Sequence, residues 1–312
     1  MLSPMPLQPD IAVLGTLTRD TTVYADGTRT ENLGGLLYTL TTLASLFDGQ
    51  ARIRPVANVG ADFAGTASAA LRLPGIDPRH VHTVPEPNNH VYLQYHDAIR
   101  RDEVLVGLVR PVGLEHACEA LEARHYMVNL TSGRDLELAT LEELRRRYAG
   151  VIQLDVHSLT LAFGAGGLRV LAVPPDWPQW VACADWVQMN ETEARLLGGG
   201  GAVERFAASL LDLGPSTVLV TLGAQGVVGA WREGRGRRSL RLGPPARYAQ
   251  PFPTGCGDVF GAAFAFARLQ GAGVADAMRV ANGVAGTKAG LEPLAALHTI
   301  RAHAAAHLAR WL

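Results

Sequence analysis

The feature that most constrains the fold of this 312-residue chain is a rhythm of short apolar runs separated by helical stretches. The apolar runs cover residues 11–16, 53–59, 126–130, 151–155, 186–189 and 218–221, and helical periodicity fills several of the gaps. Strands that alternate with helices in this way are typical of a mostly parallel sheet covered by helices. Because 48% of the residues are hydrophobic, the chain has enough apolar material to fill such a core. The sequence therefore predicts an α/β fold and excludes a disordered or fibrous chain.

Two polar stretches, at about residues 17–33 and 88–109, break this rhythm. The first is rich in turn residues around Asp26-Gly27, and the second alternates apolar and polar residues on either side of a turn at Asp97. Both patterns are typical of exposed antiparallel hairpins. We therefore expect a small satellite sheet. Since no long linker interrupts the chain, we expect residues 1–312 to form a single domain with both hairpins inserted in it.

Charge and residue usage exclude several classes of protein. Lys and Arg number 28 and Asp and Glu 29, so the net charge of −1 argues against a nucleic-acid partner. The only lysine is Lys288, and its setting in Gly286-Thr287-Lys288-Ala289 is not a Walker-type phosphate loop. A phosphate ligand would therefore have to be bound by backbone amides, helix ends and arginines.

Cysteine usage and hydropathy bear on disulfides, metal sites and the compartment in which the protein is expected. Three widely spaced cysteines predict neither a disulfide framework nor a zinc site, and His80 and His82, on a short strand-like run, are expected to be solvated or in the core. The first ten residues lack the pattern of a signal peptide, and no run reaches the roughly 18 apolar residues that a membrane span needs. We therefore expect a cytoplasmic protein with no membrane partner.

The most informative segment is Pro253-Thr254-Gly255-Cys256-Gly257-Asp258, which precedes a long helix of small residues. Its glycines leave the amides of a helix start free to bind an anion, although Asp258 would also be an ordinary helix cap. A second motif, Asn190-Glu191-Thr192-Glu193, opens a helix after one strand and, taken alone, fits an ordinary helix start. A third, at residues 221–226, follows another strand and, taken alone, fits a plain turn. In open α/β sheets such segments converge at the carboxyl ends of the strands, where ligands bind.

Taken together, these motifs resemble the ribokinase-like (PfkB) carbohydrate kinases. The resemblance covers nearly the whole chain and follows the family order, which is Gly34-Gly35, Gly60-x-Asp62-x-x-Gly65, Asn190-x-x-Glu193, Thr221-x-Gly223-x-x-Gly226 and Gly255-Cys256-Gly257-Asp258. It implies a three-layer α/β/α fold with a mostly parallel central sheet and a small β lid. It also implies a kinase that transfers the γ-phosphoryl group of ATP to a hydroxyl of a small sugar or polyol.

The resemblance also implies roles for individual residues. Asp258 is expected to act as the general base, and the amides of Gly255, Cys256 and Gly257 as the anion hole for the transferred phosphoryl group. Glu193 is expected to hold Mg²⁺ through water. The residues expected to contact ATP are Asn190, Thr221, Gly223, Gly226 and Asn282, and those expected to contact the substrate are Asp20, Gly34, Gly35, Thr39 and His157.

The chain departs from the family pattern at several positions. Thr39 replaces a substrate-binding Asn, and Asp155-Val156-His157-Ser158 replaces Asp-x-Asn-x-Arg, so His157 either contacts substrate or fills a polar turn. Phe252-Pro253 replaces Asp-Thr, whose Asp helps to bind a monovalent cation, so the sequence argues against activation by potassium. Cys256 sits at a helix N-terminus, where a thiol pKa tends to fall; it is either sensitive to oxidation or simply a small residue.

Several alternatives stay open at this point. A nucleoside kinase of the same fold would need an aromatic platform, for which Tyr92, Tyr95 and Phe163 are candidates. A catalytically silent sugar or nucleotide sensor would have had no need to keep Asp258 and its flanking glycines. Arg100 and Arg101 either reach the phosphates or are solvated, and the exposed edges of the lid favour a homodimer through the hairpins. The sequence does not identify the acceptor hydroxyl or the preferred nucleotide.

Overall fold

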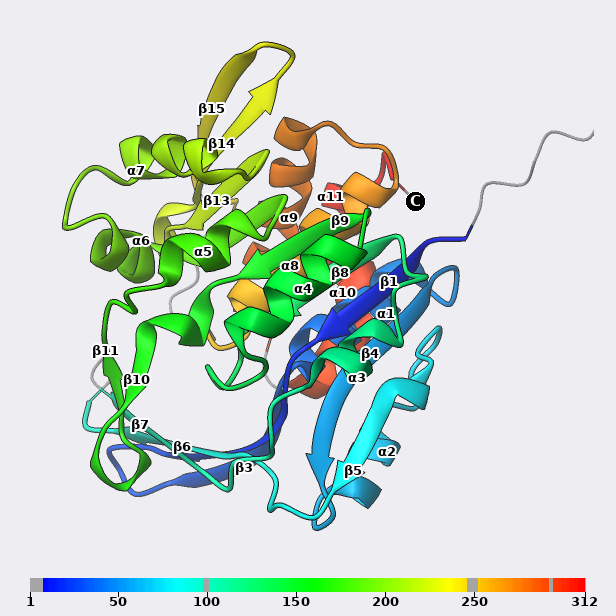
Figure 1. The fold of residues 1–312 in the computed structure, drawn as a ribbon, viewed down its shortest axis with the longest axis vertical. Coiled ribbons are helices and arrows are strands. Elements are labelled where there is room, and N and C mark those ends of the chain that lie inside the picture. Colours follow the sequence, from blue (N-terminus) through cyan, green and yellow to red (C-terminus); the bar gives the residue numbers. More distant parts are fainter. Residues whose placement is uncertain (1–7, 98–100, 246–251, 292–293, 312) are drawn as a thin grey trace, which may run out of the picture.

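The main body of the protein is built on a nine-stranded sheet (Figure 1). A computed structural model describes residues 8–97, 101–245, 252–291 and 294–311. The strand order is β15-β14-β13-β12-β9-β8-β1-β4-β5. All neighbouring strands from β13 to β5 pair in parallel, whereas β14 pairs antiparallel with both β13 and β15. The strands are β1 (Asp10–Leu14), β4 (Arg52–Gly60), β5 (Val81–Val84), β8 (His125–Asn129), β9 (Val151–Asp155), β12 (Trp186–Asn190), β13 (Thr217–Thr221), β14 (Val227–Glu233) and β15 (Gly236–Leu242).

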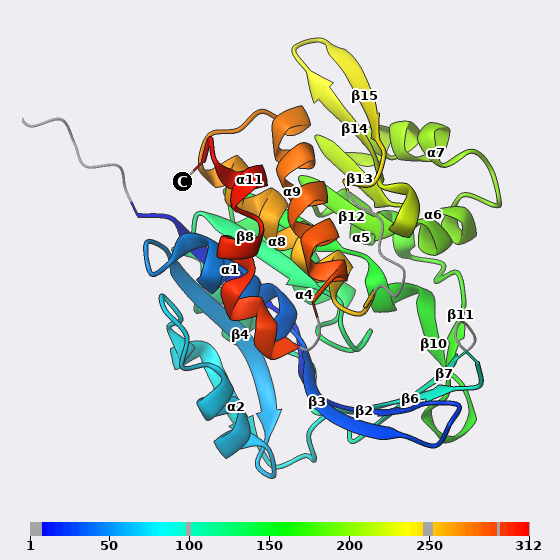
Figure 2. The same ribbon diagram turned by 180° about the vertical axis from the view of Figure 1, so that it is seen from behind.

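Helices cover both faces of this sheet (Figures 1 and 2). One face carries α1 (Leu37–Phe47), α2 (Ala64–Ala70), α8 (Cys256–Leu269), α9 (Val274–Ala289), α10 (Ile300–His303) and α11 (Ala305–Leu308). The other carries α3 (Leu114–Cys118), α4 (Leu138–Arg147), α5 (Trp177–Ala182), α6 (Glu191–Leu197) and α7 (Val203–Leu210). The expected three-layer α/β/α fold is confirmed.

Each face of the sheet has its own hydrophobic core, because successive side chains of a strand point to opposite faces. In β1, Ile11 and Val13 belong to the core under α1 and α8, whereas Ala12 and Leu14 belong to the core under α3 and α4. This double burial explains why the central strands appear in the sequence as continuous apolar runs.

The two polar hairpins form a separate four-stranded sheet in the order β3-β2-β6-β7, which is the expected lid. Its strands are β2 (Leu17–Val23), β3 (Arg29–Gly35), β6 (His90–Tyr95) and β7 (Arg101–Val106). A short hairpin of β10 (Leu161–Phe163) and β11 (Arg169–Leu171) lies beside β7, which it approaches through a bridge between Val104 and Leu168. Arg100 lies outside the described residues, and the side chain of Arg101 is also not described.

The sequence analysis placed six central strands within two residues of their ends but did not predict β10, β11, β14 or β15. In β15, which lies at the edge of the sheet, four of seven residues are polar, so it lacks the apolar run that marks the central strands. Within the described ranges, no helix has both the length and the apolar character needed to cross a membrane.

Replacing Leu141 by Ala tests the core between the sheet and α4. Leu141 is 0% exposed, so we expect the free energy of unfolding to fall by about 2–5 kcal/mol. Leu171→Ala is the matched control because Leu171 is 56% exposed, and it should lower the free energy of unfolding by about 0.5 kcal/mol or less. Urea titrations followed by circular dichroism measure both costs, and equal losses would contradict the packing described here.

Candidate active site

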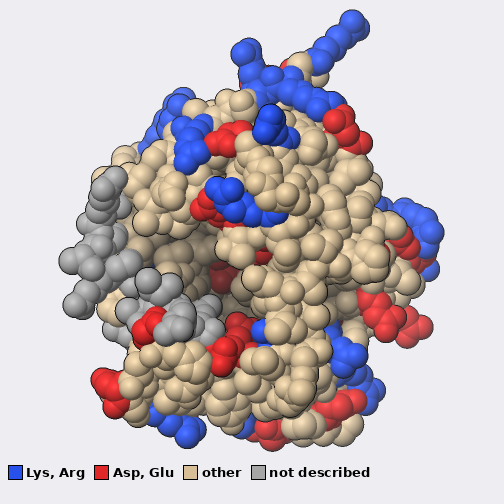
Figure 3. All heavy atoms as spheres, turned by 90° about the vertical axis from the view of Figure 1, so that its left-hand side faces the viewer, with Lys and Arg blue, Asp and Glu red and all other residues tan. Residues whose placement is uncertain are grey.

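The polar residues of the central strands meet at the carboxyl edge of the sheet, facing the lid. Parallel register places Asn129 beside Asp155 and Asn190 beside Thr221 at the ends of their strands. This edge opens into the hollow seen in Figure 3, where acidic side chains lie inside the depression. The carboxyl edge is also where open α/β sheets bind ligands.

Helix α8 begins at this edge with a turn that only glycine allows. Gly255 has φ +79°, in the left-handed region, and a Cβ on it would clash with the ring of Tyr38. At Gly257, by contrast, the nearest atom to an added Cβ is the Gln188 side-chain nitrogen at 3.9 Å, so packing does not explain this glycine. Cys256 N donates to Pro253 O at 3.1 Å, but among the described residues the amides of Gly255 and Gly257 have no hydrogen-bond partner. These two amides and the open space at Gly257 are what an anion site requires.

Asp258, the third residue of α8, is held from behind by two buried polar side chains. Asn129 Nδ2 lies 3.5 Å from Asp258 Oδ1 and also donates to Thr39 Oγ1 at 2.9 Å. Thr39 in turn hydrogen-bonds Asp258, and it is fully buried, so the structure places it behind the carboxylate rather than on the cleft surface. Burial raises the pKa of Asp258, whereas the charge of His157 and these hydrogen bonds lower it.

Asp155, Glu193 and His157 surround Asp258 with charge. Burial raises the pKa of Asp155 to about 8, the charge of His157 lowers it, and the charges of Asp258 and Glu193 raise it further. Desolvation lowers the pKa of His157, but a hydrogen bond to Glu193 and the nearby carboxylates outweigh it and raise that pKa to about 10. Because half of the His157 side-chain surface is exposed, solvent screens part of this attraction.

His157 also has an unusual backbone, with φ +25°, which is uncommon for a residue other than glycine. Its Nδ1 lies 3.8 Å from Glu193 Oε1. A strained residue held against a carboxylate cluster at the mouth of a cleft is typical of a functional position.

Asn190 and Glu193 form a complete capping box at the start of α6. Glu193 N donates to Asn190 Oδ1 at 3.0 Å, and Asn190 N donates to Glu193 Oε2 at 2.8 Å. Asn190 Nδ2 also donates to Glu193 Oε1. The ordinary helix-start interpretation of this motif therefore holds, and both carboxylate oxygens of Glu193 already accept protein hydrogen bonds.

The remaining residues expected to contact ATP lie on one side of the cleft. Thr221 ends β13, and the turn that follows it contains Gly223 and Gly226 and is closed by a hydrogen bond from Gly226 N to Gly223 O at 3.1 Å. Asn282 of α9 donates to Gly243 O at 2.8 Å and so anchors the end of β15. The structure thus places Thr221 beside Asn190, and Asn282 contacts Gly243, which lies against Gly226.

On the lid, Asp20 and Gly34 are in contact across β2 and β3. A Cβ on Gly34 would overlap the Asp20 carboxylate, so the glycine makes room for that side chain, and Gly35 follows at the end of β3. Thr18 Oγ1 donates to Asp20 Oδ1 at 2.6 Å. Burial raises the pKa of Asp20 to about 6, Thr18 lowers it, and the charges of Glu103 and Asp258 raise it further.

Lys288 lies next to the α8 turn. Its side chain is buried, and Nζ donates to the carbonyl oxygens of Phe252 at 3.0 Å and Leu291 at 3.3 Å. Its charge also acts on Cys256, in the first position of α8. The only lysine of the chain thus places a buried positive charge near the amides of the anion turn.

The expected fall in the pKa of Cys256 is wrong. Burial raises the pKa of this thiol, and the charge of Lys288 only partly opposes the rise. Since the thiolate is the reactive form, the structure supports the small-residue interpretation of Cys256 rather than sensitivity to oxidation.

Sequence analysis missed Tyr38, Asn129 and Gln188, named Lys288 only as the single lysine of the chain, and named Asp155 only as part of a motif. Asn129 and Asp155 had a detectable signal, because each is a polar residue at the carboxyl end of an apolar run. Tyr38, Gln188 and Lys288 had none, since their partners are distant in the sequence.

Comparisons with known proteins agree with the fold. The model of the pfkB family of carbohydrate kinases matches residues 165–292. A ribokinase-family kinase that depends on pyrophosphate is similar in structure, with a TM-score of 0.77 and 18% identity, covering 89% of this chain and 95% of that one. No curated protein sequence matches the chain.

Two ribokinases are similar over nearly their whole length. The enzyme from Thermotoga maritima has a TM-score of 0.76 and 19% identity, and the Arabidopsis thaliana enzyme, in complex with ribose and ATP, has a TM-score of 0.75 and 19% identity. Each comparison covers 96% of this chain and 99% of the other. The chain therefore has the ribokinase fold, and residues 165–292 match the model of the pfkB family of carbohydrate kinases.

Proposed function

We propose that this protein is a kinase that transfers the γ-phosphoryl group of ATP, with the help of Mg²⁺, to a hydroxyl of a small neutral sugar or polyol. The observation that carries the proposal is the start of α8, where Asp258 lies beside the amides of Gly255 and Gly257, for which the described residues offer no hydrogen-bond partner, whereas Cys256 N donates to Pro253 O at 3.1 Å. A base and an anion site in adjacent positions are what phosphoryl transfer to a hydroxyl needs.

In this proposal Asp258 accepts the proton of the acceptor hydroxyl as that oxygen attacks the phosphorus. Thr39 and Asn129 fix the orientation of the carboxylate, which is why both are buried behind it. The amides of the α8 turn and the positive end of the helix stabilise charge on the transferred group. The lid brings Asp20 against the acceptor hydroxyls and excludes water, which would otherwise compete for the phosphoryl group.

The donor set of the cleft fits Mg²⁺, which prefers oxygen ligands and keeps several of its waters. Asp155 and Glu193 supply carboxylates, and because both Glu193 oxygens already accept hydrogen bonds from Asn190, Glu193 would hold the ion through water. The ion would neutralise phosphate charge that these carboxylates repel.

ATP is the donor we favour, because the turn at residues 221–226 and the contact between Asn282 and Gly243 offer further groups beside Asn190 that a nucleoside could contact and a diphosphate would not need. Pyrophosphate is the alternative donor, since structurally similar members of the ribokinase family depend on it.

The acceptor face of the lid favours an uncharged substrate. Asp20 and Glu103 act on each other electrostatically, so an acceptor that already carries a phosphate would be repelled. Among similar structures, one holds ribose and another holds myo-inositol.

The aromatic residues give limited support to a nucleoside acceptor. Phe163 is covered by the guanidinium of Arg169, 4.2 Å from its ring centre, and Tyr92 stands next to Thr21, whose side chain points away from the Asp20 face. The pair of Tyr24 and Tyr95, stacked at 5.7 Å, is the remaining platform. Nucleosides therefore belong in the acceptor panel as the second candidate.

We also propose that Lys288 takes the place of a monovalent cation. The site lacks the carboxylate that would help to hold such an ion, since Phe252 stands in its position. The ammonium of Lys288 instead donates hydrogen bonds to the carbonyl oxygens of Phe252 and Leu291, beside the turn that begins α8. A homodimer through the lid stays a prediction, which sedimentation velocity would test.

The central experiment measures phosphoryl transfer to pentoses, hexoses, inositols, sugar phosphates and nucleosides, with Mg-ATP or Mg-pyrophosphate as donor. We expect a neutral sugar or polyol to be phosphorylated from ATP, and Asp258→Asn to lower kcat by about 10²–10⁴-fold. Asp276→Asn is the matched control, because Asp276 is likewise the third residue of its helix but lies on the surface of α9. If the protein binds ATP and a sugar but transfers nothing, it is a sensor and the proposal fails.

The pH dependence of kcat/KM tests the role of His157. The charge of His157 lowers the pKa of Asp258, which must be ionised to act as a base. Removing that charge in His157→Gln raises the pKa of Asp258, so the acidic limb of the profile should move to higher pH. His303→Gln, at an exposed position of α10, should leave the limb in place. A shift to lower pH in His157→Gln would contradict this arrangement of charges.

Monovalent salts test the role of Lys288. The wild-type rate should be the same in potassium and in tetramethylammonium chloride, whereas Lys288→Ala should lose about tenfold or more and regain part of it with K⁺ or NH₄⁺. Arg279→Met removes an exposed cation from the same helix and should change little. A wild-type enzyme that requires potassium would refute the proposal.

A further inference from the structure

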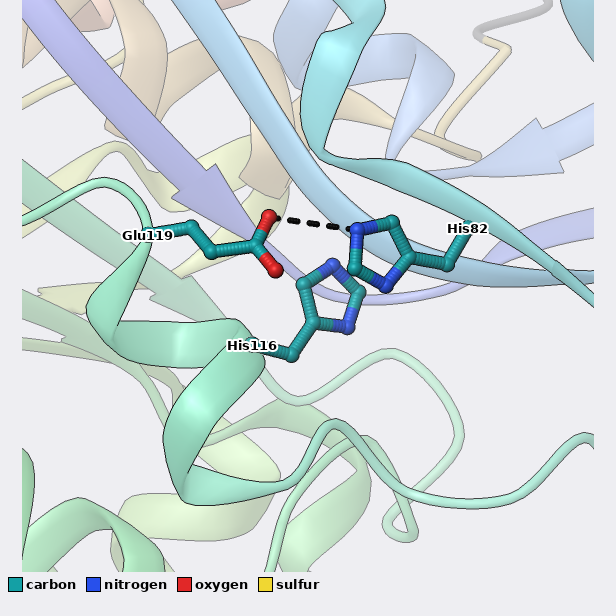
Figure 4. Close-up of side chains that lie close together, drawn as sticks. All are labelled: His82, His116 and Glu119. Atoms are coloured by element: carbon teal, nitrogen blue, oxygen red, sulfur yellow. Dashed lines mark hydrogen bonds and ion pairs between the residues drawn. The ribbon is translucent and has the colours of Figure 1, made fainter.

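A second group of polar side chains lies away from the cleft, where β5 passes α3 (Figure 4). His82 comes from β5, His116 from α3, and Glu119 from the residue after the end of α3. One potential ligand atom from each of these three residues lies within 4.8 Å of the others. These atoms are close enough for a single ion to contact all three after small side-chain movements.

The geometry of the cluster is already constrained. The rings of His82 and His116 are stacked face to face, with centres 3.7 Å apart and planes within 5° of parallel. Glu119 lies next to this pair of rings. His82 Nε2 lies 3.1 Å from Glu119 Oε2. His116 Nε2 lies 2.8 Å from the carbonyl oxygen of His80. Two imidazoles and a carboxylate are a donor set typical of zinc and related transition metals.

His80 adds support from behind the cluster. Its Nδ1 lies 3.2 Å from the same oxygen of Glu119, and its side chain is only 8% exposed. Within the described part of the chain, His80 Nε2 is buried and has no hydrogen-bond partner. A buried imidazole that orients a carboxylate is the kind of outer support that metal ligands usually have.

We propose that His82, His116 and Glu119 bind a transition-metal ion of the Zn²⁺ type, which ties β5 to α3. When the ion binds His116 Nε2, the ring gives up its contact with the His80 carbonyl, and the proton on Nε2 leaves to solvent while Nδ1 takes one up, so the imidazole stays neutral. The two elements that would hold the ion flank the lid hairpin in the sequence, because the chain runs from β5 into the β6–β7 hairpin and from β7 into α3. An ion here holds both ends of that hairpin.

Equilibrium dialysis of the whole chain against Zn²⁺, with Mg²⁺ in excess to occupy the catalytic cleft, tests the site. We expect one Zn²⁺ per chain and at least about tenfold weaker binding in His82→Ala. This variant should fold, because the His82 side chain is 42% exposed. Glu119→Gln, which keeps the shape of the side chain, should also weaken binding.

His96→Ala is the matched control, because His96 pairs with Asp102 at 2.8 Å on the lid surface and belongs to no group of three potential ligands among the described residues. It should bind Zn²⁺ as the wild type does. Failure of the wild type to bind Zn²⁺, or equal binding by the wild type and His82→Ala, would overturn the site.

Hydrogen exchange tests the link to the lid. Zn²⁺ should slow amide exchange in β6 and β7 of the wild type but not of His82→Ala. Exchange that Zn²⁺ leaves unchanged would overturn the proposed tie between the ion and the hairpin.

Discussion

The parallel register of the central strands is the constraint on which the rest of the site depends. It aligns Asn129 with Asp155 and Asn190 with Thr221 at one edge of the sheet, and α8 starts above that edge. Carboxylates gathered in so small a space repel one another and lose hydration, so the pKa values of Asp155 and Asp258 rise. Such a cluster persists only because buried amides and hydroxyls donate to it and because one imidazolium lies among the carboxylates. The same electrostatic conflict makes the cleft suited to a cation and a polyphosphate.

Charge is arranged around the α8 turn as well as within the cleft. The acidic groups of the sheet and of the lid face the open side of the turn, while the ammonium of Lys288 is buried beside the turn on backbone carbonyls. An anion at the turn would therefore meet the amides of Gly255 and Gly257 and a nearby fixed positive charge. In this view the single lysine of the chain is part of the anion site, and the missing carboxylate at Phe252 is compensated rather than lost.

How much could be predicted from the sequence depended on how local each signal is. The central strands, the lid hairpins and the glycine turn before Asp258 were predictable, because apolar runs, alternation and glycine spacing are properties of short segments. The residues that support Asp258 were not predictable, because Thr39 and Asn129 lie 90 positions apart and meet only in the folded chain. The cluster at His82 was missed for the same reason, since a strand and a short helix bring its ligands together. The resemblance to the PfkB family supplied roles for the motifs but none for these contacts.

The central claim is that Asp258 and the α8 turn transfer phosphate to a neutral hydroxyl. Phosphorus NMR of one reaction mixture, with Mg-ATP and the accepted sugar or polyol, tests it most directly. The account predicts a new phosphomonoester resonance that grows as the γ-phosphate of ATP disappears, and no such resonance with Asp258→Asn over the same time. Inorganic phosphate as the only product, or an equal rate of ester formation by the variant, would contradict it.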